Sequence, residues 1–287
     1  MTFASTVAPL QASVLVAVYN HEPELRRTLL GLAAQTRRDF EVLLCDDGSG
    51  PAIAALAREL RPLFPGGLRH LWQPDAGFRK CRILNAGVRR AGADYLVVLD
   101  ADCVPHHAFV AAHLAARRPG HYLAGRRVEL DAPWTARLAS DLIRRRHLDR
   151  LIWRSLPGLW SGELRHLEAA FWLPPGWPVR PPKRKWDILL GCNFSCWKAD
   201  LERINGFDEE FTTPGGGEDT DVERRFALAD VRPLSVKHRA ICYHQWHPLV
   251  PRGTAGAELC RRRAAEGRAT CPHGLADPPG ADVAELA

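Results

Sequence analysis

The sequence predicts an α/β protein with a mostly parallel central sheet flanked by helices. Short hydrophobic segments alternate with amphipathic segments four times within about 100 residues, as in chains of β-α units. Several of the strand-like segments also end in polar side chains, which is typical of sheets that bind ligands at the carboxyl ends of their strands.

The expected elements of the first half follow one another regularly. Leu25, Leu29 and Leu32 recur at helical spacing after the first strand, which runs into Tyr19 and Asn20. The expected strands are 13–20, 40–46, 68–75 and 94–102, and the expected helices are 22–36, 51–64 and 81–91.

The regular alternation ends near residue 131. Residues 134–160 resemble an amphipathic helix, and the Pro-rich residues 173–185 predict an irregular connector. Strand, turn and helix then resume at 187–211, followed by a helix at 218–230 and one or two strands at 233–248.

The composition excludes a disordered or membrane-spanning chain. Of the 287 residues, 46% are hydrophobic and 25% charged, enough for a substantial core. No apolar run approaches the ~18 residues of a membrane helix, and the first residues do not resemble a secretory signal, so we expect a cytoplasmic protein. None of the eight cysteines forms a CxxC pair, so reduced thiols and no zinc site are expected.

Positive charge is concentrated in one segment. The chain carries a net charge of +6, but residues 117–185 hold 15 Lys/Arg against 6 Asp/Glu, a net charge of +9, together with five of the nine tryptophans. This pattern fits an anionic ligand, a membrane surface or nucleic acid, and equally a helical subdomain with a solvated basic face.

Two carboxylates follow a buried-looking strand. Asp100 and Asp102 are separated by one alanine, and side chains at i and i+2 of an extended chain point to the same side. Such a pair repels itself unless a cation is present, so the motif is a candidate ligand for Mg²⁺ or Mn²⁺. A solvated turn with two capping aspartates is the alternative.

A second acidic group follows a run of glycines. Gly215 to Gly217 form a loop that can approach a ligand closely or move, and Glu218 and Asp219 then begin an expected helix. The helix dipole favours acidic residues there, so N-terminal capping is one interpretation. The other is a general base that removes a proton from an attacking hydroxyl.

Two histidines, His244 and His247, lie in the last strand-like segment. Either could complete a mixed nitrogen and oxygen metal site with a carboxylate. They could also be polar residues at a strand edge, and their position in the chain does not decide between these interpretations.

Several motifs in order resemble a known family. The segments "SVLVAVYN", "LLCDDGS" and "LDAD" resemble the N-terminal half of family-2 glycosyltransferases with the GT-A fold. The segments "DAGFRKCRILNAG", "GCNFSCWKADLERINGFDEEF" and "GGGEDTDVERRF" are similar to the branch of chondroitin-type polymerases and β-1,4-galactosyltransferases. The resemblance covers residues 13–248, and residues 131–185 match nothing in it.

The resemblance implies a role for each candidate site residue. Asp219 would be the catalytic base and Glu218 would bind the acceptor sugar. Asp102 would ligate Mn²⁺ or Mg²⁺, with His247, or His244 instead, as the second protein ligand and Asp100 near ribose and metal. The residues implied for nucleotide and donor sugar are Ala17, Tyr19, Asp47, Arg79, Asn85, Asp100, Ala101, Gly191 and Asn193.

The resemblance also implies an organisation and an activity. One GT-A domain would span residues 1–250, with a nucleotide-sugar half at 13–105, a helical basic insertion at 131–185 on the acceptor side and a catalytic half at 186–248; a mobile or loosely docked tail would occupy 251–287. The enzyme would invert the anomeric carbon while moving a sugar from a UDP-sugar to a glycan or lipid-linked glycan, in bacterial-type cell-surface polysaccharide or lipopolysaccharide synthesis. An anionic membrane surface at the inner membrane face is a candidate partner, and nucleic acid is not expected.

Two other functional classes stay open on the residues alone. Sugar-nucleotidyltransferases also place carboxylates after a strand, but they use a glycine-rich basic loop that "AVYNHEPEL" lacks. A non-catalytic basic module for membrane or nucleic acid would leave the carboxylate motifs unexplained.

Overall fold

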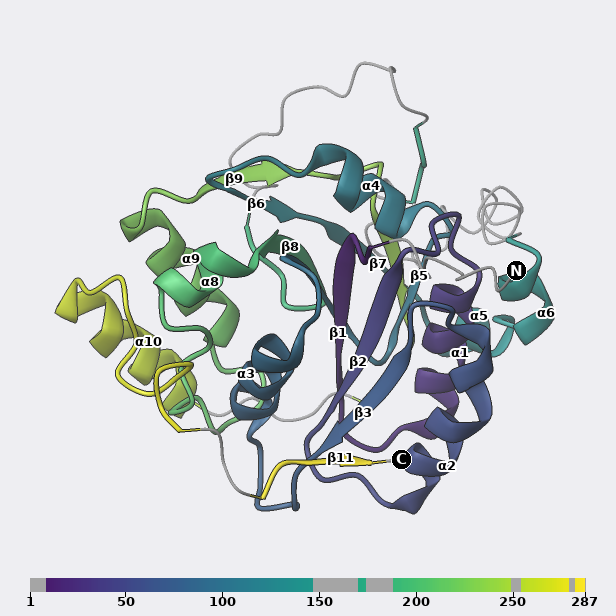
Figure 1. Cartoon of the computed structure of the whole chain (residues 1–287), viewed down its shortest axis with the longest axis horizontal. Coiled ribbons are helices and arrows are strands. Elements are labelled where there is room, and N and C mark those ends of the chain that lie inside the picture. The colour runs from purple at the N-terminus through teal and green to yellow at the C-terminus, as the bar shows by residue number, and fades with distance from the viewer. Residues whose placement is uncertain (1–8, 147–169, 174–187, 249–253, 279–281, 287) are drawn as a thin grey trace, which may run out of the picture.

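The computed structural model describes residues 9–146, 170–173, 188–248, 254–278 and 282–286, and it confirms the α/β class. An eight-stranded sheet runs in the order β11-β3-β2-β1-β4-β8-β6-β9, and a three-stranded sheet runs in the order β5-β10-β7 (Figure 1). Strands β1 to β4 are parallel, whereas β8 pairs antiparallel with both β4 and β6. The large sheet is therefore the mostly parallel sheet that the sequence predicts.

The strands of the large sheet are β1 Ala12–Val18, β2 Phe40–Asp46, β3 Leu68–Trp72, β4 Tyr95–Asp100, β6 His121–Ala124, β8 Asn193–Trp197, β9 Arg232–Ser235 and β11 Ala284–Leu286. Those of the small sheet are β5 Cys103–Pro105, β7 Arg126–Glu129 and β10 Ile241–His244. The helices are α1 Glu22–Ala33, α2 Pro51–Leu60, α3 Lys80–Arg90, α4 Phe109–Ala116, α5 Ala132–Ala136, α6 Ser140–Arg144, α8 Lys198–Arg203, α9 Glu218–Leu228 and α10 Ala255–Glu266, with a 3₁₀ turn at Arg61–Leu63.

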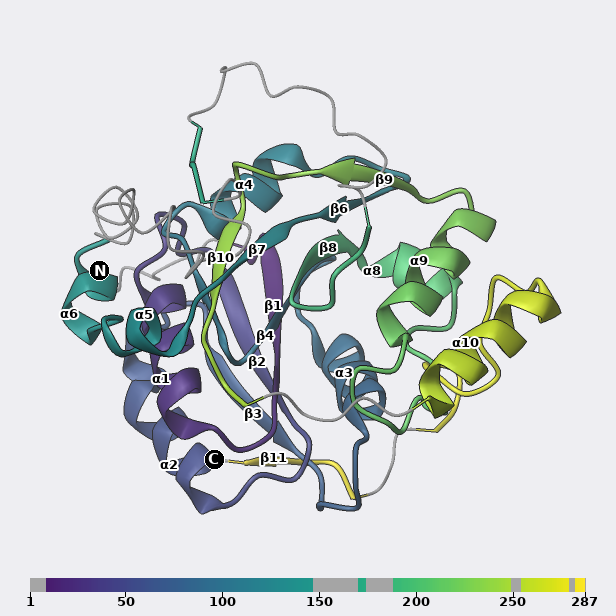
Figure 2. The ribbon, with the colours of Figure 1, turned by 180° about the vertical axis from the view of Figure 1, so that it is seen from behind.

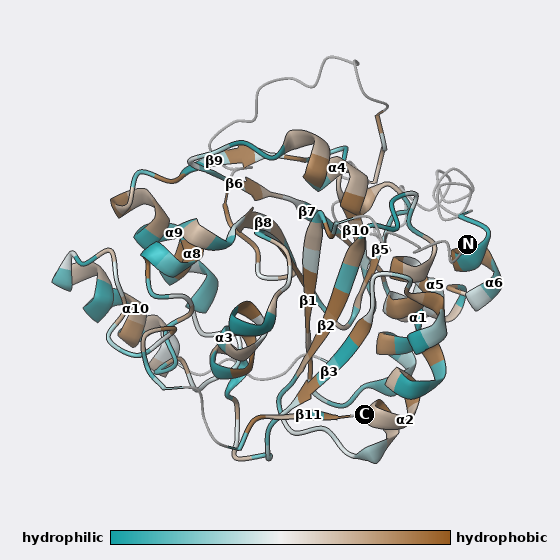
Figure 3. Ribbon diagram, in the orientation of Figure 1, coloured by the Kyte–Doolittle hydropathy of each residue, from teal (hydrophilic) through white to brown (hydrophobic). Residues whose placement is uncertain are grey.

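Both faces of the large sheet are buried. Along β1, Val14 and Val16 belong to one hydrophobic cluster, whereas Leu15 and Ala17 belong to another. Helices α1 and α2 cover one face, and α3, α8 and α9 lie on the other side (Figures 1 and 2). The central strands β1 and β2 are accordingly mostly hydrophobic (Figure 3), as expected of parallel strands buried on both faces.

The small sheet brings distant segments together next to the end of β4. Strand β10 pairs antiparallel with β5, so that His244 lies opposite Cys103, and it pairs parallel with β7. The N–H of Gln245 also donates to the carbonyl oxygen of Asp102 at 2.9 Å. This pairing places the two histidines beside the Asp-x-Asp motif.

The C-terminal segment differs from the expected mobile or loosely docked tail. In its described part, α10 packs on α9, and β11 adds an antiparallel edge to β3. The guanidinium of Arg263 pairs with the buried carboxylate of Asp208 at 2.7 Å. Gly256 allows close packing, because a Cβ there would lie 2.1 Å from the carbonyl oxygen of Gly216. Buried charge pairing and glycine contacts therefore hold a segment whose composition suggests mobility.

The expected long helix at 134–160 is interrupted in its described part. Two short helices, α5 and α6, occupy 132–144, and residues 147–169 and 174–187 of the basic insertion lie outside the described residues. Within the described ranges, no helix has both the length and the apolar character needed to cross a bilayer.

Candidate active site

A pocket of about 560 Å³ opens at the carboxyl ends of β1, β2 and β4. Residues that follow these strands line it, together with the loop before α3 and His247 from the segment after β10. The lining residues are Ala17, Val18, Tyr19, Asn20, His21, Glu24, Cys45, Asp47, Asp75, Gly77, Phe78, Lys80, Ile83, Asp100, Ala101, Asp102, Pro214 and His247. This is the edge at which parallel α/β sheets bind ligands.

Asp47 is held rigidly at the end of β2. Its carboxylate accepts hydrogen bonds from Gln73 Nε2 at 2.6 Å and from the backbone N–H of Arg79 at 2.7 Å. Burial raises the pKa of Asp47, although these two donors oppose that shift. The backbone N–H of Arg79 therefore positions the carboxylate of Asp47, which lines the pocket.

Tyr19 provides an aromatic surface at the rim. The residue is 50% exposed, and its hydroxyl donates to Asp75 Oδ2 at 2.9 Å. The next two residues, Asn20 and His21, have φ values of 56° and 55°, and the N–H of Asn20 donates to Ser49 Oγ at 2.6 Å. This sharp turn takes the chain from β1 into α1 and leaves Tyr19 beside the cavity.

Asp102, His244 and His247 form a compact group of metal-ligating side chains. Nε2 of each imidazole lies 3.4 Å from Asp102 Oδ2, and one ligand atom from each residue lies within 4.8 Å of the others. Ligands about 2.1 Å from one ion and at right angles are about 3 Å apart, so this spacing needs little adjustment. The structure therefore brings both histidines to Asp102, where the sequence left the choice between them open.

The charges within this group are strongly coupled. Burial alone would raise the pKa of Asp102, but its contacts with His244 and His247 outweigh burial and hold that pKa well below its usual range. The contact with Asp102 raises the pKa of His247 to about 9. On its other side, Nδ1 of His244 lies 3.5 Å from Glu129 Oε2, so a carboxylate orients this imidazole as in many metal sites.

Asp100 lies apart from the histidines. Its carboxylate pairs with Lys80 Nζ at 3.0 Å, and burial raises its pKa although Lys80 opposes the shift. Burial would lower the pKa of Lys80, but the carboxylates of Asp100, Asp219 and Glu218 raise it well above its usual value. In this arrangement Asp100 forms an ion pair with Lys80. It is not part of the Asp-His-His group, although it was expected among the metal ligands.

Asp219 lies in the first turn of α9, and Lys80 is one of its charged neighbours. Its Oδ2 accepts a hydrogen bond from the N–H of Gly191 at 2.7 Å, and a side chain at Gly191 would clash, because its Cβ would lie 2.4 Å from Asp219 Oδ1. Burial raises the pKa of Asp219 to about 7, with Lys80 opposing and Glu218 reinforcing the shift. A carboxylate with this pKa is suited to accept a proton near neutral pH.

The structure contradicts the expected placement of two residues in the donor pocket. Asn85 is fully buried and its amide bonds to the carbonyl oxygen of Phe207 at 2.8 Å and to Glu209 at 2.9 Å. Asn193 is also fully buried, and its Nδ2 donates to the carbonyl oxygens of Arg126 and Ala240 at 2.8 and 2.9 Å. Both side chains satisfy buried backbone groups, which is the reason that they turn away from the cavity.

Lys80 is the main functional side chain that the sequence reasoning missed. It lines the pocket and links Asp100 to Glu218, whose Oε1 lies 3.9 Å from its Nζ. A lysine at the first position of α3 is unfavourable, because the N-terminal end of the helix dipole is also positive. This unfavourable charge could have indicated a functional residue from the sequence. Gln73 was missed as well, because an amide after a strand carries no specific signal.

The fold and the pocket define a glycosyltransferase of the GT-A type. The model of the family described as glycosyl transferase family 2 matches residues 13–170, more than half of the chain. The chain therefore belongs to glycosyl transferase family 2. A second model, described as the N-terminal domain of galactosyltransferase, matches residues 179–248.

Curated relatives match most of this chain. The chain is 28% identical over 250 residues to chondroitin synthase of Escherichia coli, covering 82% of this chain and 35% of that protein. It is 29% identical over 245 residues to validoxylamine A glucosyltransferase of Streptomyces hygroscopicus subsp. limoneus, covering 84% of this chain and 52% of that protein. The chain thus spans between about a third and about a half of these relatives.

Solved structures share the fold. One is the mannosyltransferase PcManGT of Pyrobaculum calidifontis, solved in complex with GDP-Man and Mn²⁺. Its structure aligns with this one at a TM-score of 0.55 and 20% identity, and the alignment covers 94% of this chain and 67% of that one. TarS of S. aureus, residues 1–349 in complex with UDP, gives a TM-score of 0.59 at 15% identity and covers 93% of this chain and 68% of that one.

Proposed function

We propose that the protein moves a sugar from a UDP-sugar to a glycan or lipid-linked glycan, with inversion at the anomeric carbon and with a divalent metal ion at Asp102, His244 and His247. The observation that carries this proposal is that Asp102 and His247 line the same pocket as Tyr19 and Asp47. A nucleotide diphosphate would then reach from the aromatic rim to the ligand group. The process served would be synthesis of bacterial-type cell-surface polysaccharide or lipopolysaccharide.

The donor set fits a divalent ion. One carboxylate and two imidazoles suit Mn²⁺ better than Mg²⁺, which prefers oxygen ligands. When bound, such an ion would neutralise negative charge on the diphosphate leaving group. Lys80, which lines the pocket and pairs with Asp100, would supply a fixed positive charge there.

Asp219 is the proposed general base. The N–H of Gly191 holds its carboxylate, and its pKa of about 7 leaves a useful fraction ionised at neutral pH. It would accept the proton of the acceptor hydroxyl as that oxygen attacks the anomeric carbon from the side opposite the diphosphate. A single displacement of this kind inverts the anomeric centre. Glu218, which precedes it in α9, would bind the acceptor sugar.

The choice of UDP rests on the resemblance of the sequence motifs and on the ring of the half-exposed Tyr19, on which a base can stack. TarS, which shares the fold, was solved with UDP, and PcManGT was solved with GDP-Man and Mn²⁺. Since the fold accommodates both nucleotides, the experiment must compare them directly.

The acceptor side is proposed from the sequence. Residues 131–185 combine positive charge with tryptophan, which suits an anionic glycan or the surface of an anionic membrane. Sedimentation with vesicles tests the membrane part: anionic vesicles should retain the protein and neutral vesicles should not. Absence of binding to both kinds of vesicle would remove this part and leave the proposed chemistry untouched.

A thermal-shift comparison of UDP, GDP and their sugar conjugates, each with and without Mn²⁺, tests the donor. UDP-sugars with Mn²⁺ should raise the melting temperature most, and UDP without metal should raise it less. Stabilisation by GDP compounds alone, or by UDP independently of metal, would contradict the proposed donor or the proposed metal.

A further inference from the structure

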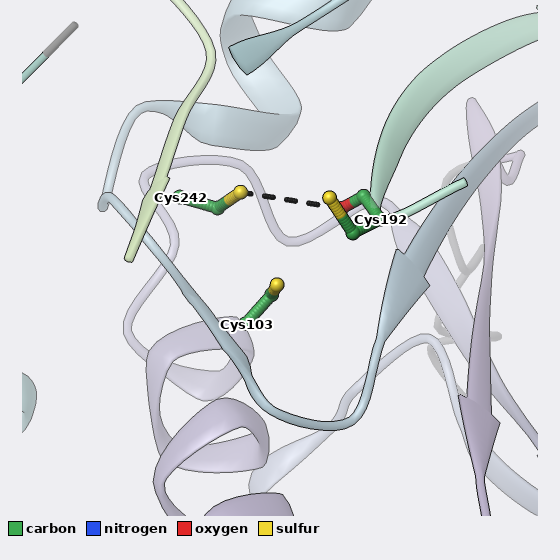
Figure 4. A group of neighbouring side chains, drawn as sticks. All are labelled: Cys103, Cys192 and Cys242. Carbon is green, nitrogen blue, oxygen red and sulfur yellow. Dashed lines mark hydrogen bonds between the residues drawn. The ribbon is translucent and has the colours of Figure 1, made fainter. Parts of the chain in front are cut away.

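Three cysteines meet next to the Asp-His-His group. The Sγ atoms of Cys103, Cys192 and Cys242 all lie within 4.8 Å of one another, and all three side chains are buried. Figure 4 shows the three thiols facing a common centre. Among the described residues, this trio and the Asp-His-His group are the two sets that could hold a metal ion.

The trio depends on the topology of both sheets. Cys103 begins β5 and Cys242 lies in β10, where the antiparallel register sets Cys242 opposite Pro105. Cys192 comes from the turn before β8 in the large sheet. The thiols therefore come from three separate segments and connect the two sheets. A CxxC spacing needs both cysteines in one short segment, so it cannot reveal such a group.

Polar partners surround these sulfurs. Nη1 of Arg127 donates to Cys192 Sγ at 3.8 Å, and the Cys242 thiol donates to the carbonyl oxygens of Arg126 at 3.7 Å and Cys192 at 4.0 Å. The Cys103 thiol donates to Oδ1 of Asp102 at 3.3 Å. The three cysteines also belong to one hydrophobic cluster, just as Cys196 and Cys81 belong to the cluster on the face of the large sheet that carries α3. The guanidinium of Arg127 favours the thiolate form of Cys192, the form in which a cysteine ligates a metal.

We propose that Cys103, Cys192 and Cys242 bind a thiophilic divalent cation of the Zn²⁺ class, at a site distinct from the Asp-His-His group. Tetrahedral coordination with metal–sulfur bonds of about 2.3 Å places the sulfurs about 3.8 Å apart, so separations of up to 4.8 Å need to close by about 1 Å. Each thiol releases its proton to solvent as it ligates the cation. Thiolate sulfur selects such soft cations over Mg²⁺ and Mn²⁺.

Asp102 lies between the two groups. Its Oδ2 faces His244 and His247, whereas its Oδ1 faces the Cys103 thiol. Asp102 is not a member of the cysteine group, so the two groups remain separate ligand sets. The proposal does not depend on sugar transfer, because the cysteine ligands are separate from the nucleotide pocket.

Titration of the reduced protein with Cd²⁺ alone tests the site, because cadmium bound by thiolates absorbs in the near ultraviolet and cadmium bound by histidine and carboxylate does not. We expect one Cd²⁺ per chain to produce this absorption and Zn²⁺ to compete it away. The substitutions Cys192→Ser and Cys242→Ser should each abolish it. The matched control Cys196→Ser, at another buried cysteine, should keep it, and so should His247→Ala, which disrupts only the other site.

Absence of the absorption in the unmodified protein would overturn the proposal, and so would its persistence in Cys192→Ser and Cys242→Ser. If those variants do not fold, cadmium NMR of the unmodified protein decides instead. A resonance in the sulfur-rich range supports the site, and a spectrum with nitrogen and oxygen ligands alone contradicts it. None of these readouts needs a nucleotide, so failure here is distinguishable from failure of the proposed glycosyl transfer.

Discussion

The ionisation of Asp219 decides whether this residue can act as a base. Burial disfavours its charged form and raises its pKa from 3.8 to about 7, while Lys80 limits the shift. The ionised, proton-accepting form therefore becomes dominant only as the pH rises through about 7.

We expect Asp219→Asn to lower kcat by about 10²- to 10⁴-fold and to leave UDP affinity close to that of the unmodified protein. The amide keeps the shape of the side chain but cannot accept the proton. The measurement is single-turnover transfer together with UDP titration. Asp200→Asn is the matched control, since burial also raises the pKa of Asp200 but that residue lies on α8, where its charged neighbour is Arg203.

The pH profile gives an independent test of the same residue. A carboxyl group with a raised pKa stabilises the folded state less when it is ionised than when it is protonated. The free energy of unfolding should therefore fall as the pH rises from 3.8 toward 7, while activity rises over the upper part of that range. We therefore expect kcat/KM to increase through about pH 7 and Asp219→Asn to melt no earlier than the unmodified protein at mildly alkaline pH. A flat profile below neutrality would argue against Asp219 as the base.

His244 and His247 should contribute jointly to metal affinity. Because each Nε2 lies 3.4 Å from the same carboxylate oxygen, removing either imidazole leaves an incomplete ligand set. His244→Ala and His247→Ala should each weaken Mn²⁺ affinity by at least about tenfold, measured by titration in the presence of UDP. His121→Ala, at a histidine in β6, should leave it unchanged. Equal Mn²⁺ affinity in all three variants would remove the histidines from the site.

At the level of secondary-structure elements, Asn85 connects α3 to the loop that precedes α9. Its side chain donates to the carbonyl oxygen of Phe207 and accepts from the N–H of Phe207 at 2.9 Å. Asn85→Ala leaves these buried backbone groups without partners, so we expect a loss of about 1–3 kcal/mol in the free energy of unfolding, measured in urea. UDP affinity should stay the same at temperatures where the variant is folded. Weaker UDP binding with unchanged stability would restore the nucleotide role implied by the resemblance.

A buried ion pair contributes to the docking of α10. Arg263 contacts the fully buried Asp208, whereas the adjacent Arg262 is exposed. Arg263→Ala leaves an uncompensated buried carboxylate and should cost about 3–5 kcal/mol, measured by chemical denaturation. The neighbouring Arg262→Ala should change stability by less than about 0.5 kcal/mol. If both substitutions change the free energy of unfolding by similarly small amounts, the result would support a loosely attached tail.

For the molecule as a whole, local patterns were sufficient to predict the parallel half of the fold. Alternating hydrophobic segments predicted β1 to β4 and their helices, and the polar residues that follow β1, β2 and β4 converge on one pocket as expected. These features are encoded within short stretches of sequence. The short strands β5, β6 and β7 were not predicted, because three or four residues give too little periodicity.

The remaining features depend on contacts between distant segments. Asn85 and Asn193 have residue types suited to a ligand, yet each satisfies buried backbone groups that only the folded structure brings near. The partner of Lys80 across the chain, Glu218, could not be inferred from local sequence, and neither could the meeting of Cys192 with Cys242. The docked tail was missed because its composition is polar, while the Asp208–Arg263 pair that holds it joins residues far apart in the chain.

Anomalous diffraction from crystals grown with UDP and Mn²⁺ tests the central claim most directly. We predict one manganese peak within bonding distance of Asp102, His244 and His247, with the uridine between Tyr19 and Asp47. A manganese peak at Asp100 and Glu218, or a uridine bound outside this pocket, would contradict the account.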